Sequence, residues 1–342
     1  MSNVCIHYFS GTGNTQRAAH LLEADLTRRG DSVTLCDITK DSRPSEHFDA
    51  HIFMFCILSW SAPVMMKRYV RALPEEEGAR GAVLAIFGGN ADYDGDAGQG
   101  VQQICSILRR RGYDVSLSDG IAYPTNWVQF SNPPAEDSCT ALRARSDARL
   151  TLFAERFSKA EKSLYTASPL ARVLTKIPAF FFGIMGRRFL GKAFIADSSC
   201  TKCGLCAKCC PAKTITMNGP KGKPRWKANC ENCNRCMNVC PSASIQTSVP
   251  RLVLHFGLIA ASSIASKKLA LMLAAFLPVA GIVSTLASIA AALLFFALLF
   301  AAQLVIADRL ILLLQFIPPI DAFFCLTFTK RRRRYKAPGF KA

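Results

Sequence analysis

Acidic side chains are scarce in the second half of this chain. Residues 151–342 contain 27 Lys and Arg but only six Asp and Glu, whereas residues 1–150 contain 15 basic and 18 acidic residues. A basic surplus often indicates nucleic-acid binding, but no nucleic-acid-binding motif accompanies it here. The surplus coincides with long apolar runs, so we expect an anionic membrane surface as the partner and no nucleic acid.

Several familiar site patterns are also missing. The five histidines have no metal-ligand spacing, and no Ser, His and Asp set for hydrolysis is visible. The glycine-rich turn near residue 10 lacks both the Gly-Lys-Ser/Thr ending of a P-loop and the Rossmann G-x-G-x-x-G. Met1 is followed at once by a strand-like run, so we expect no secretory leader and a reducing cytosolic environment for the thiols.

Cysteine, in contrast, is abundant, and eight of the 15 cysteines fall into two copies of one spacing. Each copy reads C-x2-C-x2-C-x3-C-P, the run that holds [4Fe–4S] clusters in two-cluster ferredoxins, where the fourth cysteine binds the other cluster. A zinc ribbon is the alternative, but it leaves no third cysteine in each run. The spacing predicts two clusters with crossed ligation, one on Cys200, Cys203, Cys206 and Cys240, the other on Cys230, Cys233, Cys236 and Cys210.

The first 30 residues predict a phosphate-binding turn. An apolar run at 3–9 reads as a buried strand, and a helical pattern covers 16–29. The turn between them is rich in glycine and hydroxyl groups, so its N–H groups and side chains can bind a phosphate at the start of the helix. The residues of this turn are Ser10, Gly11, Thr12, Gly13, Asn14 and Thr15.

Strand and helix patterns continue to alternate up to about residue 160, which predicts a doubly wound α/β fold with a parallel sheet. The further strands are expected at 32–38, 50–58, 81–88 and 113–121, and the helices at 64–73, 98–111 and 137–162. Ligands of such sheets bind beyond the carboxyl ends of the strands. Besides the phosphate turn, two strand ends carry candidate ligand contacts, namely Ser59 and Trp60, and Gly88, Gly89, Asn90 and Tyr93.

The phosphate turn and the two aromatic loops resemble flavodoxin over about residues 1–160. This resemblance implies bound FMN, a strand order of 2-1-3-4-5, and Trp60 and Tyr93 as neighbours of the isoalloxazine ring. With the cysteine runs, the chain resembles the flavodoxin–ferredoxin fusion proteins of anaerobic bacteria and archaea. Those chains soon end in an Arg-Tyr-x-x-Pro tail, and here the similar Arg334-Tyr335-Lys336-Ala337-Pro338 comes some 80 residues later.

The added residues contain a long apolar segment. Leu269–Ala307 has no charged residue over 39 positions, which allows two membrane-spanning helices, expected at 264–283 and 287–307 with a tight turn around Ser284–Ser288 and a kink at Pro278. The run at 310–328 contains two prolines and an aspartate, so we expect it at the membrane interface, with a third span as the alternative. Basic residues flank both ends, which predicts that both ends face the cytoplasm.

We therefore expect the chain to have five parts. They are a flavodoxin-like FMN domain at 1–165, a basic aromatic connector at 166–192, a 2[4Fe–4S] ferredoxin-like α+β domain at 193–250, a membrane segment at 251–329 with a hairpin at about 264–307, and a basic cytoplasmic tail at 330–342. The connector either lies on the membrane surface or packs its aromatic rings between the domains.

The expected function is electron transfer between the two clusters and FMN at the cytoplasmic membrane, linking a soluble redox protein to a membrane partner. The alternative is a flavin-dependent reductase that acts directly on a quinone or another lipid-soluble substrate. A redox sensor that signals through its helices is a third hypothesis, although no signalling module supports it.

Overall fold

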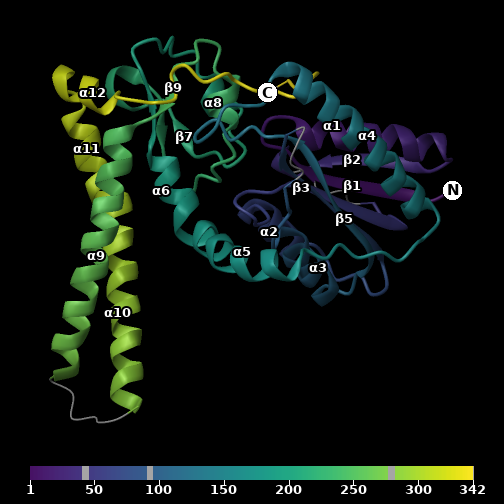
Figure 1. Cartoon of the computed structure of the whole chain (residues 1–342), viewed down its shortest axis with the longest axis horizontal. Helices are drawn as coiled ribbons and strands as arrows, with labels where there is room; N and C mark the ends of the chain where they lie inside the picture. Colours follow the sequence, from purple (N-terminus) through teal and green to yellow (C-terminus); the bar gives the residue numbers. More distant parts are fainter. Residues whose placement is uncertain (41–45, 91–94, 276–281, 342) are drawn as a thin grey trace.

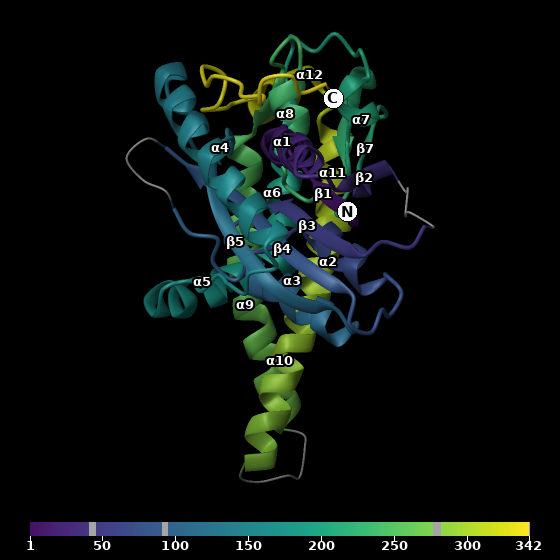
Figure 2. The ribbon, with the colours of Figure 1, turned by 90° about the vertical axis from the view of Figure 1, so that its right-hand side faces the viewer.

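The chain folds into an α/β body, a cysteine-rich unit beside it, and a long helical hairpin that projects away from both (Figure 1). The structure is a computed structural model that describes residues 1–40, 46–90, 95–275 and 282–341. Figure 2 shows the hairpin leaving the molecule on one side, while the chain ends on the opposite side near α1.

The α/β body is built on a five-stranded parallel sheet with the order β2-β1-β3-β4-β5, which confirms the predicted flavodoxin-like fold. Its central strands are continuous apolar runs, as expected of a sheet covered on both faces. The strands are β1 (Asn3–Phe9), β2 (Ser32–Asp37), β3 (Ala50–Cys56), β4 (Arg80–Gly89) and β5 (Asp114–Pro124).

Helices cover both faces of this sheet. On one face, α1 (Asn14–Arg28) and α4 (Glu136–Ser158) bury Leu22, Leu26 and Phe153 against the strands. On the other face, α2 (Val64–Arg71) and α3 (Gly100–Arg110) close a second apolar core, and a short 3-10 turn, η1 (Ile38–Lys40), follows β2. The carboxyl ends of the strands point toward the cysteine-rich unit (Figure 1).

The cysteine-rich unit has little regular structure. Two antiparallel pairs, β6 (Phe194–Ala196) with β9 (Ile245–Thr247) and β7 (Ile215–Thr216) with β8 (Arg225–Trp226), hold it together. Three short helical segments complete it, α7 (Leu205–Lys208), η3 (Pro220–Gly222) and α8 (Arg235–Val239). Its small core packs cysteine side chains against apolar residues, among them Phe194, Trp226 and Met237.

The connector forms α5 (Pro169–Phe181), a π-helical turn η2 (Phe182–Gly186) and α6 (Arg187–Lys192). Its helix starts with Ser168 as N-cap, whose Oγ accepts from the N–H of Ala171 at 3.2 Å. Phe182 is buried against Trp127, as a packing connector requires. Phe180 and Phe181 are instead 61% and 52% exposed, so these two rings do not pack between the domains.

The hairpin consists of α9 (Val249–Ala275) and α10 (Ile282–Ala302), and α10 continues through the π-helical turn η4 (Gln303–Ala307) into α11 (Asp308–Leu314). The turn predicted at Ser284–Ser288 is wrong, because these residues lie inside α10, where the Ser288 hydroxyl donates to the Ser284 carbonyl at 2.9 Å. Pro278 lies outside the described residues. A last short helix, α12 (Pro318–Phe324), follows.

The two ends of the membrane segment, before α9 and after α12, lie next to each other on the cysteine-rich unit. Ser248, just before α9, pairs with Thr327, just after α12, and the N–H of Val249 donates to the carbonyl of Leu326 at 2.9 Å. The described helices include three that are long and apolar enough to cross a membrane, at Pro169–Lys192, Val249–Ala275 and Val283–Leu314.

Candidate cofactor and cluster sites

The predicted phosphate turn lies between β1 and α1 and is almost fully buried. Gly13 has a φ of 107°, a conformation that glycine adopts without strain, and its N–H donates to Ser10 Oγ at 3.1 Å. The hydroxyl of Thr15 is 0% exposed and has no hydrogen-bond partner among the described atoms. A buried hydroxyl without a partner at the start of a helix fits a contact with a phosphate oxygen. That this turn binds a phosphate stays a prediction.

Residues from distant parts of the chain close over this turn. Arg235 of the cysteine-rich unit donates from Nε to the carbonyl of Gly11 at 2.8 Å and also donates to the carbonyl of Ser10. Asn126 donates to the hydroxyl of Thr12. Sequence reasoning did not predict that Arg235 or Asn126 contacts this turn, because their partners lie more than 100 residues away.

The C-terminal tail also holds the turn. The Tyr335 hydroxyl donates to Asn14 Oδ1 at 2.7 Å, and the N–H of Ala337 donates to the Thr12 carbonyl at 3.0 Å. Both residues belong to the tail string that the sequence comparison with the fusion proteins singled out, so that string was the signal for this contact. The predicted basic tail also contacts the α/β body, since Arg332 donates to the Val128 carbonyl at 2.9 Å.

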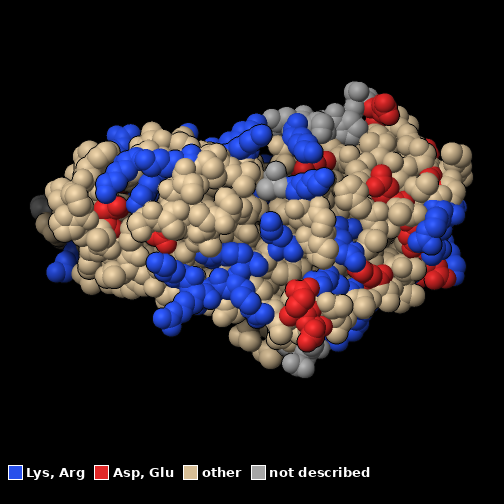
Figure 3. Space-filling model, turned by 90° about the horizontal axis from the view of Figure 1, so that it is seen from above, with Lys and Arg blue, Asp and Glu red and all other residues tan. Residues whose placement is uncertain are grey.

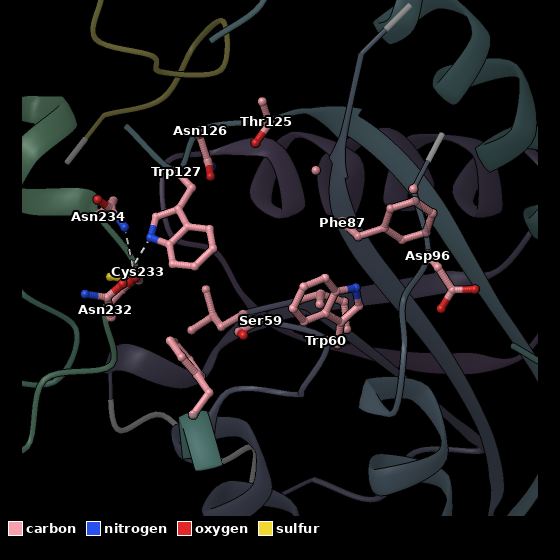
Figure 4. Close-up of a pocket in the computed structure, with 15 residues that line it drawn as sticks. Ser59, Trp60, Phe87, Asp96, Thr125, Asn126, Trp127, Asn232, Cys233 and Asn234 are labelled. Atoms are coloured by element: carbon pink, nitrogen blue, oxygen red, sulfur yellow. Dashed lines mark hydrogen bonds between the residues drawn. The ribbon is translucent and has the colours of Figure 1, made fainter. Parts of the chain in front are cut away.

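A cavity of about 230 Å³ lies beside the phosphate turn, at the carboxyl ends of the strands. Figure 4 shows Trp60 and Trp127 on two sides of this cavity, with Asn126 and Thr125 above them. Ser59 and Trp60 both adopt left-handed backbone conformations, with φ of 48° and 58°. Such strain is concentrated at functional sites, where the surrounding structure enforces it.

The structure brings three of the six predicted strand-end contacts to this cavity. Ser59, Trp60 and Gly88 line it, and Gly89 lies next to it, since its carbonyl accepts from the N–H of Thr125 at 3.1 Å. Asn90 directly follows β4, and Tyr93 lies outside the described residues. The loop after β5 was missed, although Thr125, Asn126 and Trp127 stand at a strand end, where the fold rule would have found them.

The cysteine-rich unit forms the other wall of this cavity. Asn232, Cys233 and Asn234 line it, and Trp127 Nε1 donates to Asn232 Oδ1 at 3.2 Å (Figure 4). The phosphate turn touches the same run, because a Cβ on Gly11 would approach the Cys233 carbonyl to 2.9 Å. The proposed flavin pocket and one predicted cluster site therefore share Cys233.

The two cysteine runs have the same backbone conformation. Left-handed residues occur 30 positions apart in the two runs, with φ of 58° and 57° at Lys202 and Asn232, and 48° at both Lys213 and Ala243. The eight predicted ligands are also offset by 30 positions. The unit is thus a structural repeat, as crossed ligation by two equivalent runs requires.

The first predicted ligand set gathers around one cavity, which Cys200, Cys203, Cys206 and Cys240 all line. Burial alone would raise the pKa of the Cys240 thiol, but hydrogen bonds from the Ser244 and Ser242 hydroxyls outweigh it, so that the pKa is lowered. Such bonds favour the thiolate, the form of cysteine that binds metals. This donor set fits an iron–sulfur cluster.

The second set is more deeply buried. Burial, above all, and the neighbouring Cys230, Cys233 and Cys210 thiols raise the pKa of Cys236. Backbone N–H groups approach two of the sulfurs, from Asn232 to Cys230 at 3.3 Å and from Thr214 to Cys210 at 3.5 Å. Four thiols this close in a dry site are unfavourable as free thiolates, but a cluster takes up their charge, so this set also fits.

Two of the histidines form a separate buried chain within the α/β body. His7 Nε2 lies 3.0 Å from His51 Nδ1, His7 Nδ1 lies 2.8 Å from the Tyr69 hydroxyl, and His51 Nε2 lies 3.2 Å from a Glu76 carboxylate oxygen. Burial and the neighbouring His51 lower the pKa of His7 to about 3. Cys5 adds a third possible metal-binding atom, with all three ligand atoms within 4.8 Å of one another. His51 Nε2 and this Glu76 oxygen are both buried and, although they lie close together, neither has a hydrogen-bond partner among the described atoms.

Comparison with known proteins gives matches in structure alone. No protein-family model matches this chain, and no curated protein is similar to it. Similar solved structures include a flavodoxin from the domain Archaea (16% identity, TM-score 0.32, covering 46% of this chain and 99% of that one) and oxidised flavodoxin 1 from Bacillus cereus (17%, 0.34, 46% and 98%). A third is Fusobacterium nucleatum flavodoxin bound to flavin mononucleotide (14%, 0.33, 47% and 100%).

These matches concern the N-terminal half of the chain. At such low identity and TM-score they carry no argument, and the flavodoxin-like fold rests on the strand order observed here.

Proposed function

We propose that this protein is a membrane-anchored electron-transfer protein that passes electrons between two [4Fe–4S] clusters and FMN on the cytoplasmic side, and that links a soluble redox protein to a membrane partner. The observation that carries the proposal is the cavity shared by Trp60, Trp127 and Cys233, since it puts a predicted cluster ligand at the wall of the predicted flavin pocket.

The chain's own residues supply the binding and the electrostatics. The turn from Ser10 to Thr15 would hold the FMN phosphate, and Trp60 and Trp127 would flank the ring. When bound, FMN exchanges one or two electrons and each cluster exchanges one. Arg235 lies between the phosphate turn and the cysteine-rich unit, where it also donates to the Cys209 carbonyl at 3.0 Å. Its charge favours the reduced clusters and thus raises their reduction potentials.

A soluble partner would meet the first cluster site. Cys203 is exposed, as are Lys202 and Lys208 on either side of it. Figure 3 shows many Lys and Arg side chains on the face opposite the hairpin, with most of the visible Asp and Glu over the α/β body. An acidic redox protein fits the basic part of this face, because complementary charge steers association.

Membrane attachment is supported by the hairpin and by the connector. The two ends of the hairpin meet at the Ser248–Thr327 pair, so an even number of crossings would keep the redox parts and the tail together on one side. In α5, an exposed apolar stripe lies opposite the face that Gln99 binds through the Thr175 hydroxyl at 3.2 Å. This arrangement suits a helix that lies in the membrane interface, and its stripe consists of Leu170, Val173, Leu174, Ile177, Phe180 and Phe181.

Stopped-flow reduction of the full-length protein in lipid nanodiscs tests the proposal. A reduced soluble ferredoxin should bleach the flavin absorption, and Cys236→Ala should abolish this reaction while FMN remains bound. Cys325→Ala, outside both predicted ligand sets, is the control and should react like the wild type. Equal rates in wild type and Cys236→Ala would contradict a route through the clusters.

A further inference from the structure

An apolar groove of about 500 Å³ separates the redox parts from the hairpin. Phe296, Phe300 and Leu304 from α10 and η4 form one wall, and Ile184 and Met185 from η2 form another. Phe300 and Leu304 are each only 6% exposed, although they belong to the apolar helix Val283–Leu314. The groove therefore lies where this helix leaves the redox parts, the level at which the lipid head groups would lie.

The mouth of the groove is basic. Arg68, Arg187 and Arg188 line it, and no Asp or Glu is among the described residues that do so. Arg187 is occupied, because it donates to the Cys230 carbonyl at 2.9 Å and lies 3.7 Å from the Glu231 carboxylate. Arg188 donates one N–H to the Ile184 carbonyl at 2.7 Å, which leaves its remaining guanidinium N–H groups available to a ligand.

Arg68 is the most available of the three. Its side chain is exposed, and it makes neither a hydrogen bond nor an ion pair within the described part of the chain. A guanidinium binds phosphate with two parallel N–H donors. An apolar groove with available guanidinium groups at its mouth matches a ligand with a phosphate at one end and a hydrocarbon chain at the other.

We propose that this groove binds an anionic phospholipid, with the head-group phosphate on Arg68 and Arg188 and an acyl chain along Phe296, Phe300 and Leu304. The proposal rests on the membrane insertion of the hairpin. Ala228 and Asn229 also line the groove and directly precede Cys230, so the lipid would connect the second predicted cluster site to the membrane. A neutral quinone would use the apolar walls but not the arginines.

Lipid binding to the full-length protein provides the test. Delipidated protein in detergent is titrated with phosphatidylglycerol or with diacylglycerol, which lacks the phosphate, and bound lipid is counted by native mass spectrometry. The wild type should prefer phosphatidylglycerol. Arg68→Gln should weaken phosphatidylglycerol binding by about 10–150-fold, the effect of losing one hydrogen bond to a charged group, and leave diacylglycerol binding unchanged. The control Arg110→Gln removes an exposed arginine of α3 and should change neither.

A variant that fills the groove shows whether lipid binds inside the groove or only to the basic surface. Ala297→Trp, in the apolar wall, should abolish the bound lipid with all three arginines in place. Equal affinity of the wild type for both lipids, or unchanged binding in Arg68→Gln, would overturn the proposal, and so would a neutral quinone that competes for the groove regardless of Arg68. Flotation with vesicles keeps the two proposals apart, because Arg68→Gln should still float, whereas a wild type that stays in solution would refute membrane insertion itself.

Discussion

The α/β body and the cysteine-rich unit lie side by side but are held together in different ways. The body has five parallel strands of six to eleven residues and an apolar core on each face of its sheet. The strands of the cysteine-rich unit have two or three residues, and three of the nine buried residues in its core are predicted cluster ligands. We therefore expect the body to fold by apolar burial and the unit to depend on what its cysteines bind.

Loss of iron should give the largest difference between the two regions, measured as protection of their backbone amides from exchange. Removing the iron with a chelator should abolish amide-exchange protection over residues 194–247, because a site formed by metal ligands couples binding to folding. The strands β1, β3 and β4 should keep their protection. Exchange measured by mass spectrometry checks both, with protein that retains its iron as the matched control. Unchanged protection of the unit without iron would show that its own core holds it.

The second prediction concerns the junction between the unit and the hairpin. Asp308, 1% exposed, lies 2.6 Å from Lys192 and 3.2 Å from Arg251, both also buried. Asp308→Ala should lower the free energy of unfolding by about 3–5 kcal/mol, because it leaves buried cations uncompensated. Denaturant unfolding in detergent measures this, and Glu155→Ala, from an exposed pair with Lys159, should have no measurable effect. Equal effects of the two variants would mean that the junction is solvated.

A smaller effect is expected at the phosphate turn of the body. Thr15→Val keeps the shape of the side chain but removes the orphan hydroxyl, so FMN affinity should fall by about 10–150-fold while riboflavin affinity stays unchanged. Flavin fluorescence titration of the full-length protein checks it, with Thr151→Val on the outer side of α4 as the control. Equal losses for FMN and riboflavin would argue against a phosphate contact.

Acidification should lower the free energy of unfolding of the α/β body gradually. Burial holds His7 neutral with its pKa lowered to about 3, so the unfolded state, with its histidine pKa of about 6.5, binds more protons between these values. Stability should thus be full above about pH 6.5 and fall by at most about 1.4 kcal/mol per pH unit below it. Denaturant unfolding at a series of pH values measures the slope, which His7→Asn should reduce. A slope that His7→Asn leaves unchanged would assign the acid effect to other groups.

The two regions also differ in what their sequence predicts. Apolar runs of strand length predicted the strands of the body, and the Ser10–Thr15 turn predicted a phosphate loop, because these signals are local. The strand order was implied by the resemblance to flavodoxin. Arg235 and Asn126 reach the same turn from afar, and a single sequence carries no signal for such pairings. For Tyr335, the signal was the resemblance of its tail string to the fusion proteins. Trp127 could have been found from the strand-end rule alone.

The sequence predicted a helical hairpin, but the bounds of its helices were wrong. Its first helix begins at Val249, some 15 residues before the expected start, and includes the charged Arg251. Local hydropathy penalises that charge, whereas the fold compensates it with Asp308, 57 residues further on. The turn was predicted from small polar residues, but the Ser288 hydroxyl donates to the Ser284 carbonyl within α10, so these residues fit a helix.

The proposed function requires that one chain carries two clusters and one flavin close together. Protein purified under anaerobic conditions should contain about eight iron atoms, about eight acid-labile sulfides and one FMN per chain, as two four-iron clusters and one phosphate-binding pocket require. Iron, sulfide and flavin analysis of the same sample measures all three directly. Bound zinc without labile sulfide, or a full iron content without FMN, would contradict the account.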